Sequence, residues 1–136
     1  MSATFSIHVE PERDLVRIRM AGFFTQADIE DFLEARRKAH QQLRCGPNAH
    51  LTLNDLSGMK IQAQDIVAAF QSMLASPDYR SRRLAFVTGS TLARGQLLRA
   101  ATGRYVRCFD DVATAEAWLL EENQADKQEP RRCATG

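Results

Sequence analysis

The chain is poor in cysteine, and its cysteines are not spaced to act together. Of 136 residues only Cys45, Cys108 and Cys133 are cysteine, and no two form a C-x-x-C pair. An odd number without such spacing argues against a disulfide framework and against a structural zinc site. We therefore expect a protein that folds without disulfides in a reducing, cytoplasmic compartment.

Long apolar runs and an excess of charge of one sign are also missing. Residues 1–5 have neither the basic nor the apolar part of a signal peptide, and no stretch approaches the ~20 apolar residues that cross a bilayer. The formal net charge is +1, although 26% of the residues are charged. We therefore expect no membrane span and no nucleic acid partner.

Hydrophobic periodicity predicts the secondary structure. Alternating apolar residues indicate strands near 5–9, 16–20, 50–55 and 105–109, and the continuous apolar run 84–87 is typical of a central parallel strand. Helical spacing predicts helices over 26–43, 63–75 and 91–102, and a fourth that begins after Asp110 or Asp111. Thr25, followed three residues later by Asp28, is a capping-box pattern for the first helix.

This element order, ββαβαβαβα, predicts a two-layer α/β domain with a mixed five-stranded sheet. The first two strands should form an antiparallel hairpin, and the helices should lie mainly on one face. We assign residues 1–123 to this single domain and 124–136 to a polar, disordered C-terminal tail. The polar strand residues would then line a second face without helices: Ser6, His8, Arg17, Arg19, Thr52 and Arg107.

The residue types of a hydrolytic triad occur, but their spacing argues against catalysis. Ser57, His50 and Asp55 would have to touch one another, yet His50 and Asp55 lie at opposite ends of one strand, about 16 Å apart at ~3.3 Å per residue. We interpret Asp55 and Ser57 as residues that satisfy backbone groups. His8, His40 and His50 show no spacing of metal ligands. We therefore expect no enzyme activity, no cofactor and no metal.

One strand-to-helix junction suits an anion. Gly89, Ser90 and Thr91 precede the predicted third helix, and Arg94 lies one turn inside it. The free N–H groups at a helix start attract negative charge, although an ordinary Ser or Thr cap explains the same residues. We take these four residues as a candidate site for a small anionic or lipid-like ligand.

Charge is distributed unevenly along the second half of the chain. The segment 79–109 contains seven arginines and no acid, whereas 110–129 contains seven acids and one lysine. One interpretation is a basic surface for an acidic partner protein, with Arg80, Arg82 and Arg83 as contacts. The other is that these arginines pair within the chain with acids of the last helix, namely Glu116, Glu121 and Glu122.

Three joints between the predicted elements carry a family resemblance. They are the hairpin 5–20, the stretch 51–58 that ends in Asp-Leu-Ser-Gly, and the segment 105–119 with two acids before an Ala-rich helix that contains Trp-Leu. With the element order, they resemble the STAS-like, SpoIIAA-like family, which includes the bacterial anti-sigma factor antagonists and small proteins of unassigned function. The resemblance implies a SpoIIAA-like fold and a binding role.

The chain departs from that family at the regulatory motif. In the antagonists an Asp-Ser-Ser-Gly motif opens the second helix and one serine is phosphorylated, whereas the matching stretch here, 59–64, has no hydroxyl group. The resemblance therefore does not carry over the phosphoserine switch. Our leading hypothesis is a non-catalytic regulatory or protein-interaction module whose partner is an unidentified protein, and a homodimer is left open. The alternative is a small-molecule carrier with its ligand near the start of the third helix.

Overall fold

The computed structural model describes residues 2–46, 49–59, 62–75, 81–89 and 105–128. The helix predicted over 91–102 lies outside these ranges. The elements in chain order are β1 (Thr4–Glu10), a 3-10 turn (Pro11–Arg13), β2 (Leu15–Gly22), α1 (Gln26–His40), β3 (Leu51–Met59), α2 (Gln64–Ala75), β4 (Arg83–Val87), β5 (Tyr105–Phe109) and α4 (Val112–Gln128).

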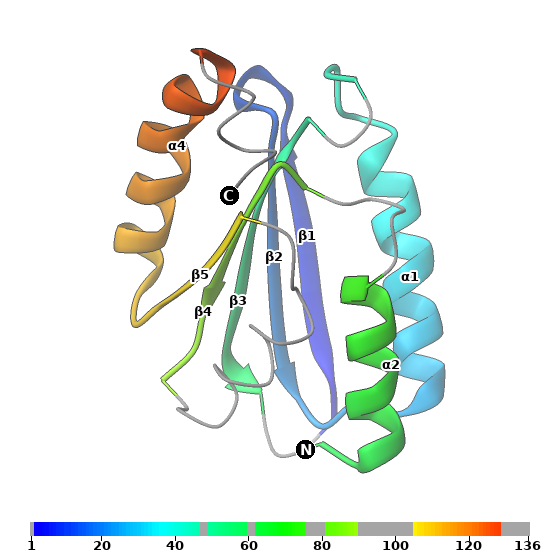
Figure 1. The fold of residues 1–136 in the computed structure, drawn as a ribbon. Helices are drawn as coiled ribbons and strands as arrows, with labels where there is room; N and C mark the ends of the chain where they lie inside the picture. The colour runs from blue at the N-terminus through cyan, green and yellow to red at the C-terminus, as the bar shows by residue number, and fades with distance from the viewer. Residues whose placement is uncertain (1, 47–48, 60–61, 76–80, 90–104, 129–136) are drawn as a thin grey trace.

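The strands form one mixed sheet in the order β1-β2-β3-β4-β5 (Figure 1). β1 and β2 are antiparallel, with Ile7 opposite Ile18, and every later pair is parallel. This confirms the predicted five-stranded sheet and its N-terminal hairpin. The hairpin turns through Asp14, whose φ of 53° is left-handed, a conformation that aspartate tolerates better than most residues.

The first helix begins as its sequence predicts. The Asp28 N–H donates to Thr25 Oγ1 (3.2 Å), and the Thr25 N–H donates to Asp28 Oδ2 (2.9 Å), so the capping box is present. α1 ends at His40, three residues before the predicted end. Basic residues occupy its last turn, where they complement the partial negative charge of the helix C-terminus.

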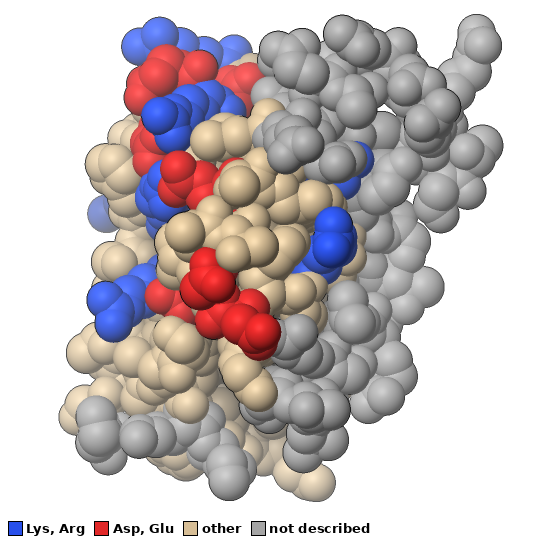
Figure 2. All heavy atoms as spheres, turned by 90° about the vertical axis from the view of Figure 1, so that its left-hand side faces the viewer, with Lys and Arg blue, Asp and Glu red and all other residues tan. Residues whose placement is uncertain are grey.

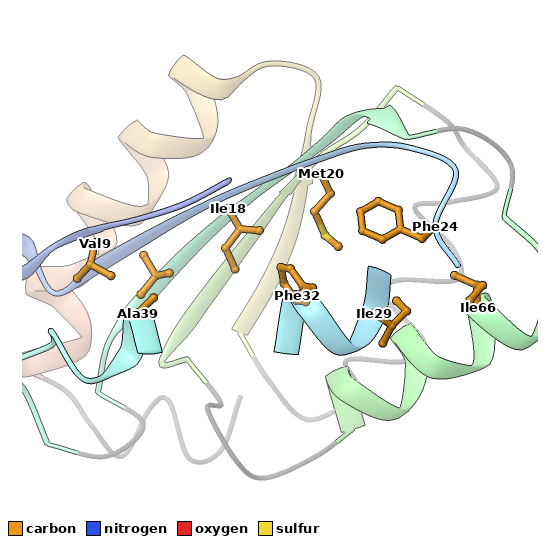
Figure 3. Packing of buried hydrophobic residues seen from close by; sticks show 9 residues of the cluster. Val9, Ile18, Met20, Phe24, Ile29, Phe32, Ala39 and Ile66 are labelled. Atoms are coloured by element: carbon orange, nitrogen blue, oxygen red, sulfur yellow. The ribbon is translucent and has the colours of Figure 1, made fainter. Parts of the chain in front are cut away.

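α1 and α2 share one face of the sheet, as expected, and cover the larger part of the core. Figure 3 shows Val9, Ile18 and Met20 of the hairpin pointing toward Phe32 and other residues of α1. Ile66 of α2 belongs to the same cluster.

α4 lies on the opposite face, which differs from the expected two-layer arrangement (Figure 1). Its Ala115 and Leu119 pack with residues of the central strands: Leu51, Leu53, Ala85 and Val87. The physical reason is that Leu51 and Leu53 of β3 point to this face and that β4 is apolar on both faces, so both faces of the sheet need cover. Thr52, predicted on the uncovered face, is buried.

α4 also continues to Gln128, five residues into the predicted tail. The last residues of that tail, 129–136, lie outside the description.

Candidate functional site

The candidate ligand site at the third helix falls mostly outside the described residues. Gly89, directly after β4, is exposed. Ser90, Thr91 and Arg94 lie outside the described ranges, and so does Arg80 of the candidate partner contacts.

Two of the predicted contact arginines are held within the fold. Arg83 opens β4 with only 5% of its surface exposed, and its guanidinium carbon lies 4.9 Å from the ring centre of Trp118. Arg82 is partly buried, and its Nε donates to the Ala49 carbonyl (3.3 Å). The prediction that Arg83 presents its charge to a partner is therefore corrected: the Trp118 face covers it, and a buried residue cannot line a docking surface.

Glu116 of the acidic helix is paired with the hairpin. Glu116 of α4 binds Arg17 of β2 and lies 3.6 Å from Arg13 Nη1. Arg17 also binds Glu10 of β1, and this hydrogen bond lowers the pKa of the Glu10 carboxyl. The side chains of Glu121 and Glu122 lie outside the description. Glu116 is therefore neutralised within the chain, by Arg13 and Arg17, which lie outside the arginine-rich segment 79–109.

The triad residue types are separated, as expected from their spacing. Ser57 donates from Oγ (2.7 Å) and from its N–H (3.0 Å) to Asp55 Oδ1, a local turn that satisfies a backbone group. His50 lies at the other end of β3, where its Nε2 is 3.3 Å from Nε2 of His40.

The histidine pair is a contact that the sequence reasoning missed. It joins the last residue of α1 to the residue before β3, and the only sequence signal is their position at two element ends that a short loop brings together. Across the described ranges, no three His, Cys, Asp or Glu side chains are arranged to hold a metal ion.

The surface around Phe23 is the strongest candidate for a functional site. Phe23, in the turn after β2, is 42% exposed, the large hydrophobic residue that stands out to solvent in the described part of the chain. Beside it, Thr4, Phe5, Ser6, Arg19 and Ala21 line a shallow hollow of about 230 Å³. We call these six residues the strand-end surface.

Figure 2 places this end of the molecule in its electrostatic context. Charged side chains gather over the upper and middle parts of the α4 side, whereas the coloured surface near the lower end is uncharged. Figure 1, in the same vertical orientation, shows that β2 ends at this lower end.

The backbone around Phe23 is held from two sides. Gln62, just before α2, donates from Nε2 to the Gly22 carbonyl (2.9 Å) and accepts from the Phe24 N–H at Oε1 (2.8 Å). Gly22 has a φ of +87°, and a Cβ there would lie 2.3 Å from the Ser2 carbonyl oxygen. Only glycine suits that position, so the turn holds Phe23 in one place.

The helices that the structure describes include none with the length and apolar character needed to cross a lipid bilayer. No family model matches the chain, and no curated protein matches it. Among solved structures, the chain is similar to an uncharacterised protein of the DUF3478 family from Shewanella loihica PV-4, described as having a SpoIIAA-like fold. The two share 16% sequence identity and superpose with a TM-score of 0.68 over 86% of this chain and 94% of that one. This likeness, together with the mixed five-stranded sheet, gives the chain a SpoIIAA-like fold.

Proposed function

We propose that this chain is a non-catalytic regulatory or protein-interaction module that contacts its partner through the strand-end surface, with Phe23 as the central contact. The observation that carries the proposal is the exposure of Phe23 in a turn whose flanking backbone is fixed by Gln62. Its neighbour Phe24 is fully buried against Phe70, with ring centres 5.8 Å apart, whereas Phe23 belongs to neither hydrophobic cluster.

The physical case rests on the cost of ordering side chains at an interface. A rigid aromatic residue buries a large apolar area and loses little freedom when it is covered, which is why aromatic residues dominate binding energy at interfaces. A turn that already holds the ring removes most of the remaining ordering cost. The adjoining hollow, about 230 Å³, is smaller than the roughly 300–1,000 Å³ of ligand pockets, so it suits a protruding side chain of a partner better than a whole small molecule.

The described side chains also support a role without catalysis. Ser57 has a carboxylate beside it but no imidazole, and the imidazoles of His40 and His50 bond to each other near the far end of β3. A serine nucleophile needs a base within hydrogen-bond reach. The small-ligand carrier stays an alternative proposal, of whose four residues the structure describes Gly89 alone.

The test is site-specific photocrosslinking in the native host, followed by affinity measurements. A photoreactive amino acid at position 23 should capture one discrete protein, whereas the same group at Glu12, exposed beside the hairpin turn, should not. The captured protein is then purified, and Phe23→Ala should weaken its binding by at least about tenfold.

The proposal would be overturned if the purified partner bound wild type and Phe23→Ala equally. It would also be overturned if position 12 captured the same protein as position 23. A titration with inorganic phosphate tests the carrier alternative separately, because binding of phosphate unaffected by Phe23→Ala would favour a ligand site elsewhere.

A further inference from the structure

The outer edge of β1 is a strand edge that another chain could extend. β1 lies at the end of the sheet order and, among the described residues, pairs with β2 alone. It is seven residues long and contains neither proline nor lysine, the residues that commonly protect edges. Phe5 and Ile7 are only partly buried there. Such an edge presents unpaired N–H and C=O groups in register for a further strand.

The sequence of β1 is compatible with antiparallel pairing to β1 of a second copy of the chain. If two β1 strands pair antiparallel about Ile7, then Ile7 faces Ile7, Phe5 faces Val9, and Ser6 faces His8 of the second copy. Apolar residues then meet apolar residues on the α1 side, and polar residues meet polar residues on the other face. The inward-outward alternation therefore continues across the junction without a register conflict.

α1 adds charge complementarity to the same edge. The helix packs against β1, with the rings of Phe5 and Phe32 edge-to-face at 5.4 Å. Its first half is acidic and its second half basic: Asp28, Glu30, Asp31 and Glu34 precede Arg36, Arg37, Lys38 and His40. Because α1 returns from the end of β2 to the start of β3, it runs in the direction of β1, and a two-fold axis at Ile7 makes the two α1 helices antiparallel. Acidic halves then face basic halves.

The flank of α1 that faces the edge can be identified from its contacts. Gln26 bonds to Asp65 of α2 (3.0 Å) and His40 to His50, so these two residues mark the flank toward the middle of the sheet. At 3.6 residues per turn, Asp31, Ala35 and Lys38 lie on the other flank. Asp31 and Lys38 are exposed, and the small Ala35 between them allows close approach.

The contact between Phe5 and Phe32 locates the position at which a two-fold axis through Ile7 of β1 passes α1. From the Phe5–Phe32 contact, the two residues to Ile7 advance about 6.6 Å along the strand at ~3.3 Å each. About four residues of helix, at ~1.5 Å each, cover the same distance and reach Arg36, next to Ala35. Asp31 of one α1 is then offset along the helix axis by about three residues, or ~4.5 Å, from the partner's Lys38, a distance that the long lysine side chain can span.

We propose that two copies of this chain associate through their β1 edges, antiparallel about Ile7, with Asp31 of each α1 facing Lys38 of the partner subunit. Phe5 and Ser6 belong both to this edge and to the strand-end surface, whereas Phe23 lies in the turn beyond the end of β2, outside the proposed strand pairing. The intrachain contact of Lys38 with Glu34 is 3.9 Å long and exposed, so it offers little resistance to the new pairing.

The test measures mass by sedimentation equilibrium over a range of protein concentrations. Wild type should reach twice the chain mass of 15.3 kDa. Asp31→Lys or Lys38→Asp alone brings like charges together at two symmetric places, so each should weaken dimerisation by about tenfold at low salt. The double variant should restore it. Both residues are exposed, so all variants should keep the circular dichroism spectrum of wild type.

Two controls separate this inference from the proposed function. Glu12→Lys should leave the dimer unchanged because Glu12 lies in the 3-10 turn at the end of β1, away from Ile7. Phe23→Ala should also leave it unchanged while it weakens the partner contact. A wild type that stays monomeric at every concentration overturns the proposal, and so does a dimer that neither single charge reversal weakens.

Discussion

The Nε2 atoms of His40 and His50 lie 3.3 Å apart, and their rings meet edge-to-face with centres 4.8 Å apart. His40 Nδ1 is 2.9 Å from the Arg36 carbonyl oxygen, which can only accept, so Nδ1 carries the proton. In neutral His40 the Nε2 atom is then the acceptor, and His50 Nε2 must be the donor. The contact therefore fits two neutral imidazoles, with their tautomers fixed by one carbonyl group.

This arrangement predicts that folding stability falls when the pH is lowered through the range in which histidine titrates. Burial lowers the pKa of His40 below 6.5, and the charge of Arg36 acts in the same direction. Below about pH 6.5 the unfolded chain therefore binds more protons at this residue than the folded one, and stability is lost as the pH falls. Urea denaturation between about pH 5 and 7 measures this slope.

The matched variant for that prediction is His40→Gln. It should be less stable than wild type at neutral pH because the histidine contact is gone, but its stability should depend less on pH in the same range. A slope equal to that of wild type would show that His40 does not contribute to the acid sensitivity.

Arg17 should stabilise the contact between the hairpin and α4. Its guanidinium bonds to Glu10 of β1 and to Glu116 of α4, and its side chain is 27% exposed. We expect Arg17→Ala to lower the free energy of unfolding by about 1–2 kcal/mol, more than an exposed pair contributes. Arg17→Lys should recover less than half, because one ammonium group cannot reach both carboxylates as the guanidinium fork does.

Arg37→Ala is the control for Arg17. Arg37 pairs with Glu34 within α1, and both side chains are about half exposed. Its removal should change the free energy of unfolding by no more than about 0.5 kcal/mol. If Arg17→Lys unfolds at the same urea concentration as wild type, the bridging role of Arg17 is wrong.

The secondary structure followed from sequence patterns because these patterns are local. Alternation located the strands, with β5 found at its observed bounds of 105–109, and Thr25 with Asp28 located the start of α1. β3 runs four residues past the predicted end because, beyond Ser57, Gly58 and Met59 continue the pairing with β2 across an irregular register. A polar residue and a glycine carry no alternation signal, so this extension was not visible in the sequence.

The candidate site depended on contacts between distant residues, which local patterns do not contain. Arg83 looked like part of a basic run, but Trp118, 35 residues later, covers it. No spacing pattern relates His40 to His50 in the sequence, and only the fold brings their rings into contact. Phe23 and Phe24 are adjacent and identical in sequence, yet one is exposed and the other is completely buried. Only the turn geometry at Gly22 decides which ring faces solvent.

That pair of phenylalanines gives a direct comparison of stability. Phe24→Ala removes a fully buried ring and should lower the free energy of unfolding by about 3–5 kcal/mol. Phe23→Ala should change it by no more than about 0.5 kcal/mol, as for surface substitutions in general. Urea denaturation of the two variants measures both values. A large loss in Phe23→Ala would mean that the ring stabilises the fold, and the strand-end surface would lose its central contact.

Gln62 should hold the Phe23 turn in place through its two opposite hydrogen bonds. Its amide donates to the Gly22 carbonyl and accepts from the Phe24 N–H, and an amide is the side-chain group that does both with fixed geometry. Gln62→Ala should lower the free energy of unfolding by about 1–2 kcal/mol. It should also weaken partner binding, because the ring is no longer held before contact.

Gln62→Glu distinguishes hydrogen bonding from side-chain size at this position. The ionised carboxylate can still accept from the Phe24 N–H, but it faces the lone pairs of the Gly22 carbonyl, so at neutral pH the variant should be at least as unstable as Gln62→Ala. When the carboxyl is protonated, its O–H can donate to that carbonyl. The folded state then favours the proton, so the stability deficit relative to wild type should shrink as the pH falls through the range in which glutamate titrates. A deficit that stays constant with pH would mean that the Gly22 carbonyl does not need a donor, and that the turn holds Phe23 without Gln62.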